Sequence, residues 1–190
     1  MGILEAIETS GFSMLVKQSG TAYVAVLAFH TIGLIFLAGV SGATAMRVLG
    51  VARSMPLAPI KEFYPLMYAG LWINVLTGSV LICLYPTEYV VDPSFYIKIG
   101  GVVAALTLVQ KLKNHLYGGG EGMDTPAGVK KAKTLAASLL VAWLVATVTG
   151  RVIAYSVTTK VQTAIGVVIV VILGLLVIRF AGRSLGLVKS

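Results

Sequence analysis

Long runs without a charged residue constrain this chain more than any other feature. No residue between Lys17 and Arg47 is charged, and none between Glu62 and Glu88. Crossing a hydrocarbon layer of ~30 Å takes about 20 apolar residues, so each interval is long enough for a membrane helix. The chain is 57% hydrophobic and 12% charged, whereas a soluble domain carries about 25% charged residues. The sequence therefore predicts an all-α integral membrane protein.

Charged residues and helical length together predict five transmembrane helices in a single domain, residues 1–190. The third helix is the least apolar, because Lys98 lies near one end and Lys111 near the other; both side chains can extend to the membrane interfaces. We expect a proline-broken turn at 54–65 and a flexible loop at 118–128. The predicted spans are 22–46, 66–85, 95–112, 134–155 and 161–178.

The basic residues predict the orientation of the helices. With five spans, eleven of the fifteen Lys and Arg residues share one side of the membrane. These are Arg47, Arg53, Lys61, Lys111, Lys113, Lys130, Lys131, Lys133, Arg179, Arg183 and Lys189. Short cytoplasmic loops are enriched in Lys and Arg, so we expect the N-terminus outside and the C-terminus in the cytoplasm. This bias also explains the net charge of +8, so the charge does not require nucleic acid as a partner. We expect the protein to lie in a bacterial inner membrane, with membrane lipids as partners.

Two local patterns concern the N-terminus and helix packing. Residues 1–20 have apolar residues at helical spacing, which predicts either an interfacial helix on the membrane or a disordered terminus. The fourth span has a stripe of small residues, and the first and third spans have small residues at 38–43 and 100–105, which lets membrane helices approach closely. We expect these three helices to pack together and the fifth to lie at the periphery. The stripe consists of Ser138, Ala142, Ala146 and Gly150.

Ionisable residues inside a membrane are candidate functional residues, because placing them there is costly. Three qualify: His30, Lys98 and Arg151. With a rise of ~1.5 Å per residue, His30 lies ~12 Å below the outer boundary and the two cations ~4–6 Å below it. Thr77 and Thr147 come near the level of His30. The sequence therefore predicts a polar site in the outer half of the bundle.

This set of residues indicates a cofactor site. A neutral imidazole is the commonest metal ligand, and histidine is an axial ligand of haem iron, so we expect His30 to bind a metal, a haem b or another tetrapyrrole, or else a quinone. Lys98 and Arg151 could neutralise the propionates of a haem. Gly33, one turn from His30, would leave room for a flat ring, and Thr77 completes the predicted cofactor-binding set.

A simpler interpretation needs no cofactor. His30 could be a buried histidine that bonds to Thr77 or Thr147 on a neighbouring helix. Lys98 and Arg151 could extend to the outer headgroups. The sequence alone leaves both interpretations open.

Other residues limit the chemistry further. His115 lies ~18 Å from the level of His30, which argues against a haem held by both histidines; its role stays open. Every acidic residue, from Glu5 to Asp124, falls in a terminus or loop. No intramembrane carboxylate is therefore available for proton-coupled transport, and no set of residues typical of a hydrolase is present.

Four short motifs carry a resemblance to a known family. They are His-x-x-Gly-Leu in the first helix, Arg-x-Leu-Gly at its exit, Thr-Gly in the second helix and Asp-Pro-x-Phe-x-x-Lys before the third. Their positions are His30, Gly33, Leu34, Arg47, Leu49, Gly50, Thr77, Gly78, Asp92, Pro93, Phe95 and Lys98. Over residues 22–115 the chain resembles a family of bacterial integral membrane proteins of unknown function. It differs at Ala45-Met46, where that family often has an acidic residue. The resemblance implies the fold and highlights His30 and Lys98, but implies no reaction.

Two classes of function remain open. The first is a small membrane subunit of a bacterial redox or energy-converting complex, not catalytic by itself, that binds a haem, another tetrapyrrole or a quinone near His30. The second is a non-catalytic structural or assembly subunit that contacts other membrane subunits or copies of itself. A looser similarity to copper-resistance membrane proteins adds metal transport as a third hypothesis, without a Met-rich copper motif to support it.

Overall fold

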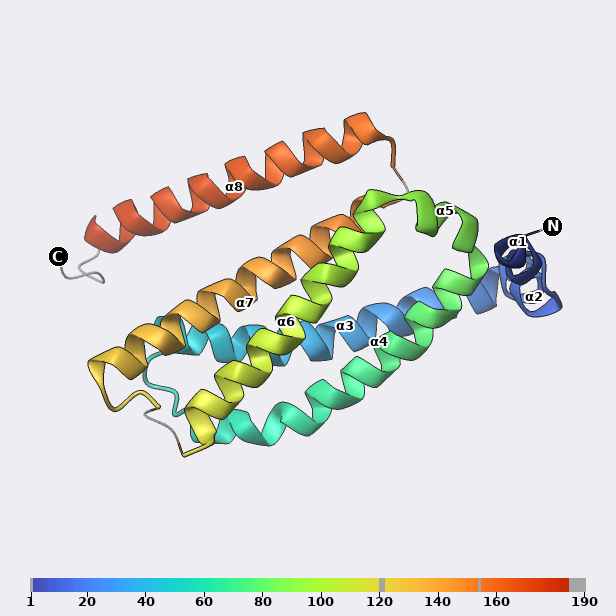
Figure 1. Ribbon diagram of the computed structural model, residues 1–190. Helices are drawn as coiled ribbons and strands as arrows, with labels where there is room; N and C mark the ends of the chain where they lie inside the picture. Colours follow the sequence, from blue (N-terminus) through green and yellow to red (C-terminus); the bar gives the residue numbers. More distant parts are fainter. Residues whose placement is uncertain (1, 120–121, 154, 185–190) are drawn as a thin grey trace.

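The protein is described by a computed structural model that covers residues 2–119, 122–153 and 155–184. These residues form helices and connecting turns, and no strand occurs among them. The helices are α1 (Ile3–Glu8), α2 (Gly11–Gln18), α3 (Gly20–Leu49), the 3-10 helix η1 (Ala58–Phe63), α4 (Tyr64–Leu84), α5 (Pro86–Val91), α6 (Pro93–Tyr117), α7 (Pro126–Val152) and α8 (Val157–Ser184). Figure 1 shows α3, α4, α6 and α7 as a bundle, with α8 set apart from it.

Four helical segments are long and apolar enough to cross a membrane, which suggests a multi-pass membrane protein. They are Gly20–Leu49, Ala58–Leu84, Pro93–Tyr117 and Pro126–Val152. They correspond to the first four predicted spans and extend beyond most of the predicted ends. The apolar part of α8, Val157–Leu173, is shorter, so a fifth span stays a prediction.

Helix-capping residues explain where α6 and α7 begin. Asp92 precedes Pro93 and its carboxylate accepts a hydrogen bond from the backbone N–H of Ser94 at 2.8 Å. Thr125 caps α7 in the same way, because its hydroxyl accepts from the N–H of Gly128 at 2.9 Å. Both arrangements satisfy N–H groups that have no partner within the helix. The predicted loop at 118–128 is therefore shorter than expected, since α7 begins at Pro126.

The N-terminal segment is helical, as two short helices, and its position on the membrane surface stays a prediction. The Ser13 hydroxyl of α2 donates to the carbonyl of Cys83, near the end of α4, at 3.0 Å. Glu8 forms an ion pair with Lys17 at 3.2 Å and accepts a hydrogen bond from the hydroxyl of Thr87. These contacts hold α1 and α2 against the end of the bundle where α5 lies (Figure 1), which we call the α5 end. The opposite end, which carries η1, is the η1 end.

The long helices pack mainly as α3 with α4 and α6 with α7, and α7 also contacts α3. As the small residues predict, α6 and α7 come close at Gly101, where a Cβ atom would lie 3.1 Å from the Cβ of Ala146. The indole N–H of Trp143 on α7 donates to the hydroxyl of Ser41 on α3 at 2.9 Å. The described part of α8 makes little contact with the other helices, mainly with α7, and Figure 1 shows it at the periphery.

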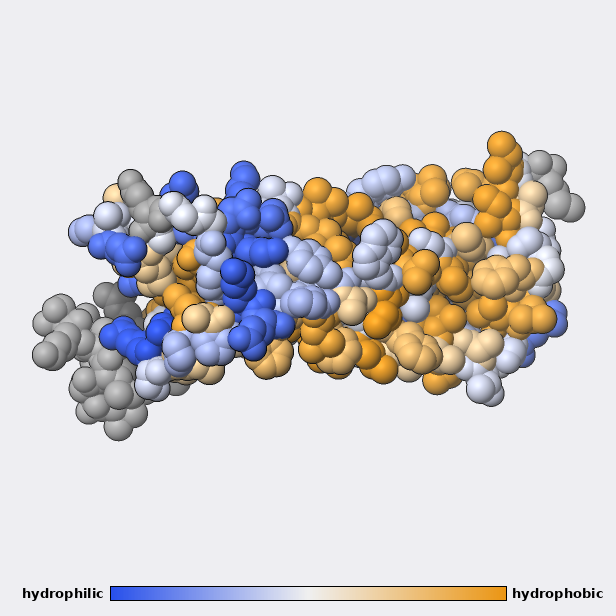
Figure 2. Space-filling view, turned by 90° about the horizontal axis from the view of Figure 1, so that it is seen from below, coloured by the Kyte–Doolittle hydropathy of each residue, from blue (hydrophilic) through white to orange (hydrophobic). Residues whose placement is uncertain are grey.

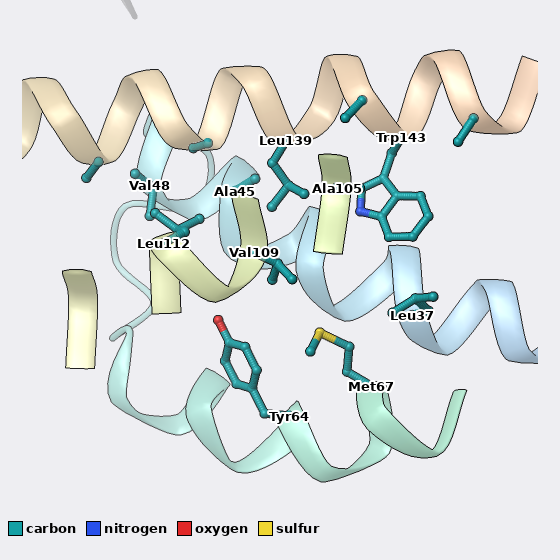
Figure 3. Close-up of a cluster of buried hydrophobic side chains, with 14 residues drawn as sticks. Leu37, Ala45, Val48, Tyr64, Met67, Ala105, Val109, Leu112, Leu139 and Trp143 are labelled. Carbon is teal, nitrogen blue, oxygen red and sulfur yellow. The ribbon is translucent and has the colours of Figure 1, made fainter. Parts of the chain in front are cut away.

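The hydrophobic core lies toward the η1 end. Figure 3 shows Leu37 and Val48 of α3, Met67 of α4, Leu112 of α6 and Leu139 of α7 meeting there. Figure 2 shows a hydrophilic band toward the same end and a broad apolar surface beyond it. In the half nearer α5, by contrast, no described residue of α6 from 93 to 104 is fully buried. The bundle is therefore tightly packed in one half and open in the other.

Candidate functional site

A cavity of about 500 Å³ occupies the open half of the bundle, between α3, α4, α6 and α7. Its volume falls in the range of about 300–1,000 Å³ that is typical of small-molecule sites. Most of its lining is apolar, with a few polar and cationic side chains. The polar and cationic residues of the lining are Tyr23, His30, Thr31, Asn74, Ser79, Tyr89, Lys98, Thr147 and Arg151. A largely apolar cavity with a few convergent polar groups is the usual form of a ligand site.

His30 is held in one orientation by Thr77. The imidazole Nδ1 lies 2.9 Å from the Thr77 hydroxyl oxygen, and this hydroxyl lies 2.6 Å from the carbonyl oxygen of Ile73. A threonine hydroxyl has one hydrogen, and a carbonyl can only accept, so Thr77 donates to Ile73. Nδ1 of His30 must then donate to Thr77. In the neutral ring the lone pair is therefore on Nε2, which has no partner among the described residues.

Asn74 ties α4 to α3 next to this histidine. Its side-chain amide donates to the backbone carbonyl of His30 at 2.8 Å. Asn74 and Thr77 lie three residues apart and therefore share one face of α4. One face of α4 thus holds the His30 backbone and ring.

A close crossing of two glycines makes these hydrogen bonds possible. A Cβ atom on Gly33 would lie 2.8 Å from the carbonyl oxygen of Gly70, and one on Gly70 would lie 2.7 Å from the carbonyl oxygen of Gly33. Only glycine allows the backbones of α3 and α4 to approach so closely. Gly33 therefore contacts α4. The expectation that Gly33 leaves room for a flat ring is wrong, because the backbone of α4 fills the space next to it.

Lys98 and Arg151 line the same cavity from α6 and α7. Lys98 is partly buried, and its aliphatic chain lies against Gly150. A Cβ atom added to Gly150 would lie 3.3 Å from the Cε atom of Lys98. Arg151 is more exposed. In the described part of the chain, neither cation forms an ion pair or a hydrogen bond.

Two of the acidic groups at the α5 end, Asp92 and Glu8, already have partners. Asp92 forms an ion pair with Lys160. Burial by itself raises the pKa of Asp92, but hydrogen bonds from Lys160 and Ser94 outweigh it and hold the pKa below its ordinary value. The hydrogen bond from Thr87, followed by the contact with Lys17, likewise lowers the pKa of Glu8. Both carboxylates are thus ionised near neutral pH and are not bound to Lys98 or Arg151.

The structure brings most of the predicted site residues together. His30, Lys98 and Arg151 line one cavity with Thr147, as the comparison of depths predicts. Thr77 lies outside the lining and bonds to His30; it is one of the two partners expected for a buried histidine without a cofactor. Gly33 lies outside the lining.

His115 takes no part in this site. It lies near the end of α6, where its Nε2 is 3.0 Å from the carbonyl oxygen of Gly128 at the start of α7. That contact is at the η1 end of the bundle.

Among the lining residues that sequence reasoning missed, Asn74 and Trp143 form hydrogen bonds between helices. Asn74 was detectable, because it is an amide within an apolar run and lies one turn before Thr77. Trp143 lines the cavity and also bonds to Ser41. No sequence signal distinguishes it from an ordinary lipid-facing tryptophan.

Comparisons with known proteins add no relative. No protein-family profile matches the chain, and neither a curated protein nor a solved structure is significantly similar to it. The resemblance to a bacterial membrane family stays a prediction.

Proposed function

We propose that this chain is a small subunit of a bacterial redox or energy-converting membrane complex and that its cavity holds a haem b, another tetrapyrrole or a quinone at His30. The observation that carries the proposal is the fixed imidazole. Its Nδ1–H is bound by Thr77, which leaves the Nε2 lone pair for a ligand. Metal-binding histidines are oriented by a hydrogen bond from the other ring nitrogen in this way.

The residues present fit a haem better than an oxidised quinone. In this tautomer, Nε2 of His30 can bind iron or accept the hydroxyl hydrogen of a quinol, but it cannot donate to a quinone carbonyl. Lys98 and Arg151 would pair with the propionates of a haem. A bound haem would supply one-electron chemistry, while His30 would hold it and Lys98 and Arg151 would orient it.

Haemin titration of the purified protein tests this proposal. We expect a shifted Soret band for the wild type and for the control His115→Ala, and no shift for His30→Ala. Thr77→Val should weaken haemin about 10–100-fold, as is typical when a residue that orients a metal ligand is lost. A wild-type protein that neither changes the haemin spectrum nor binds a quinone would refute the proposal.

A non-catalytic structural or assembly role is the second candidate, and α8 favours it. Its apolar side chains are exposed along the helix, for example Val161 (53%), Ile165 (56%) and Val168 (57%). A helix with so much apolar surface can contact lipid or a larger membrane partner. In this role, His30→Ala would lower the yield of the complex but leave turnover per assembled complex unchanged. Purification under native conditions, with mass spectrometry of bound chains and cofactors, distinguishes the two roles.

For topology, we propose five spans in the inner membrane, with the N-terminus outside and the C-terminus in the cytoplasm. The η1 end then faces the cytoplasm. The clustering of basic residues at the ends of α3 and α6 and at the start of α7 supports this orientation, because such residues are retained in the cytoplasm. The cavity then lies in the outer half of the bilayer.

A further inference from the structure

Two cations line one cavity, and neither has an ion-pair partner among the residues that the structure describes. Lys98 and Arg151 both line it, and among the described residues no carboxylate does. Cations at membrane depth usually pair with an acidic group or a backbone carbonyl. The nearest candidate along the chain, Asp92, is bound to Lys160. Within the described part of the chain, the site therefore has excess positive charge and no counterion.

Lys98 does not simply extend away from the protein. Its Cδ and Cε atoms lie 3.4 and 3.3 Å from the Cβ position of Gly150, the residue before Arg151. The side chain of Lys98 therefore packs against α7, and α7 is the helix that carries the second cation, Arg151. Two like charges in one site destabilise each other unless an anion lies near both.

The cavity also has an apolar rim formed by α4 and α6. These two helices make no extensive contact with each other in the described structure. Val75 and Ile82 of α4 and Ile99 of α6 line the cavity, yet they are 45%, 37% and 41% exposed. This opening lies on the side of two helices that are apolar enough to cross a membrane. A ligand with a hydrocarbon or ring body could thus enter from the lipid.

We infer that the cavity binds an amphiphilic carboxylate, with its acidic group at Lys98 and Arg151 and its apolar body between α4 and α6. This inference rests on the proposed ligand site at His30, but it does not require iron. The same chemistry has two sources, a haem propionate and a long-chain fatty acid.

Binding of palmitate and of its neutral methyl ester to the purified full-length protein tests the inference. We expect palmitate to bind at least about tenfold more tightly than the ester, because only the acid forms charge-assisted hydrogen bonds. Lys98→Gln and Arg151→Gln should each weaken palmitate by about tenfold or more. Lys98→Arg and Arg151→Lys, which keep the charge, should stay close to the wild type. Lys61→Gln, which removes a cation at the η1 end, is the matched control.

The outcomes separate this inference from the proposed function. The inference would be overturned if palmitate and its ester bound equally well. It would also be overturned if neither glutamine variant weakened the binding of palmitate. Haemin binding that depends on His30 but on neither cation would uphold the haem site and also overturn the inference. Palmitate binding that depends on both cations, without any Soret shift by haemin, would uphold the inference and count against the haem.

Discussion

Replacing Gly33 by alanine tests how the α3–α4 crossing supports the site. The added Cβ would lie 2.8 Å from the carbonyl oxygen of Gly70 and 2.9 Å from the side-chain nitrogen of Asn74. Carbon–oxygen contacts of this kind normally lie at about 3.3–3.6 Å. The two helices would therefore have to separate by roughly half an ångström or more at this point.

The cost follows from overpacking between rigid backbones. Extra carbon in a well-packed interface typically costs about 1–3 kcal/mol. At about 2–4 °C per kcal/mol for a chain of this size, Gly33→Ala should lower Tm by roughly 2–12 °C. Haemin binding should weaken as well, because separation of the helices would lengthen the bond from Asn74 to the carbonyl of His30.

Thermal unfolding in detergent, followed by circular dichroism, measures this effect. Gly39→Ala is the matched control, since it lies on the same helix and its Cβ would meet nothing within 4 Å. We expect the control to keep its Tm or to gain slightly from the better helix propensity of alanine. If Gly33→Ala were as stable as Gly39→Ala, the close crossing of α3 and α4 would be wrong.

Three further predictions concern topology, charge and packing. In a cysteine-free background, a cysteine placed at Gly119 should react with a membrane-impermeant thiol reagent only after the cells are opened. A cysteine placed at Ser94 should react in intact cells once the outer envelope is permeable. The reverse labelling pattern would overturn the proposed orientation. Because the folded-state pKa of Asp92 lies below its ordinary value of 3.8, its ion pair with Lys160 stabilises the fold above that value and is lost as the pH falls below it. Asp92→Asn should therefore flatten the dependence of Tm on pH in this acid range, and an unchanged profile would contradict the assignment. Trp143→Phe should lower the free energy of unfolding by about 1 kcal/mol, because one buried hydrogen bond is lost; unchanged unfolding by circular dichroism would show that this bond contributes nothing.

The candidate site was predictable in part because helical rise is constant. Counting residues from the ends of the apolar runs placed His30, Lys98 and Arg151 in one half of the bundle, and the structure brings them to one cavity. Counting could not choose between Thr77 and Thr147 as the partner of His30. That choice depends on how the helices are rotated about their axes, which depth does not specify.

The sequence by itself determined the class of structure. Long charge-free apolar runs favour helices that could cross a membrane, where each backbone group must bond within its own helix, and four such helices are present. It also indicated the contact of α6 with α7, because small residues at Gly101 and Ala146 permit close approach. Only the tertiary structure decided that α3 and α4 cross at Gly33 and that the bundle opens toward α5. Such crossings depend on contacts between residues far apart in the chain, and these contacts leave no periodic pattern in the sequence of either helix.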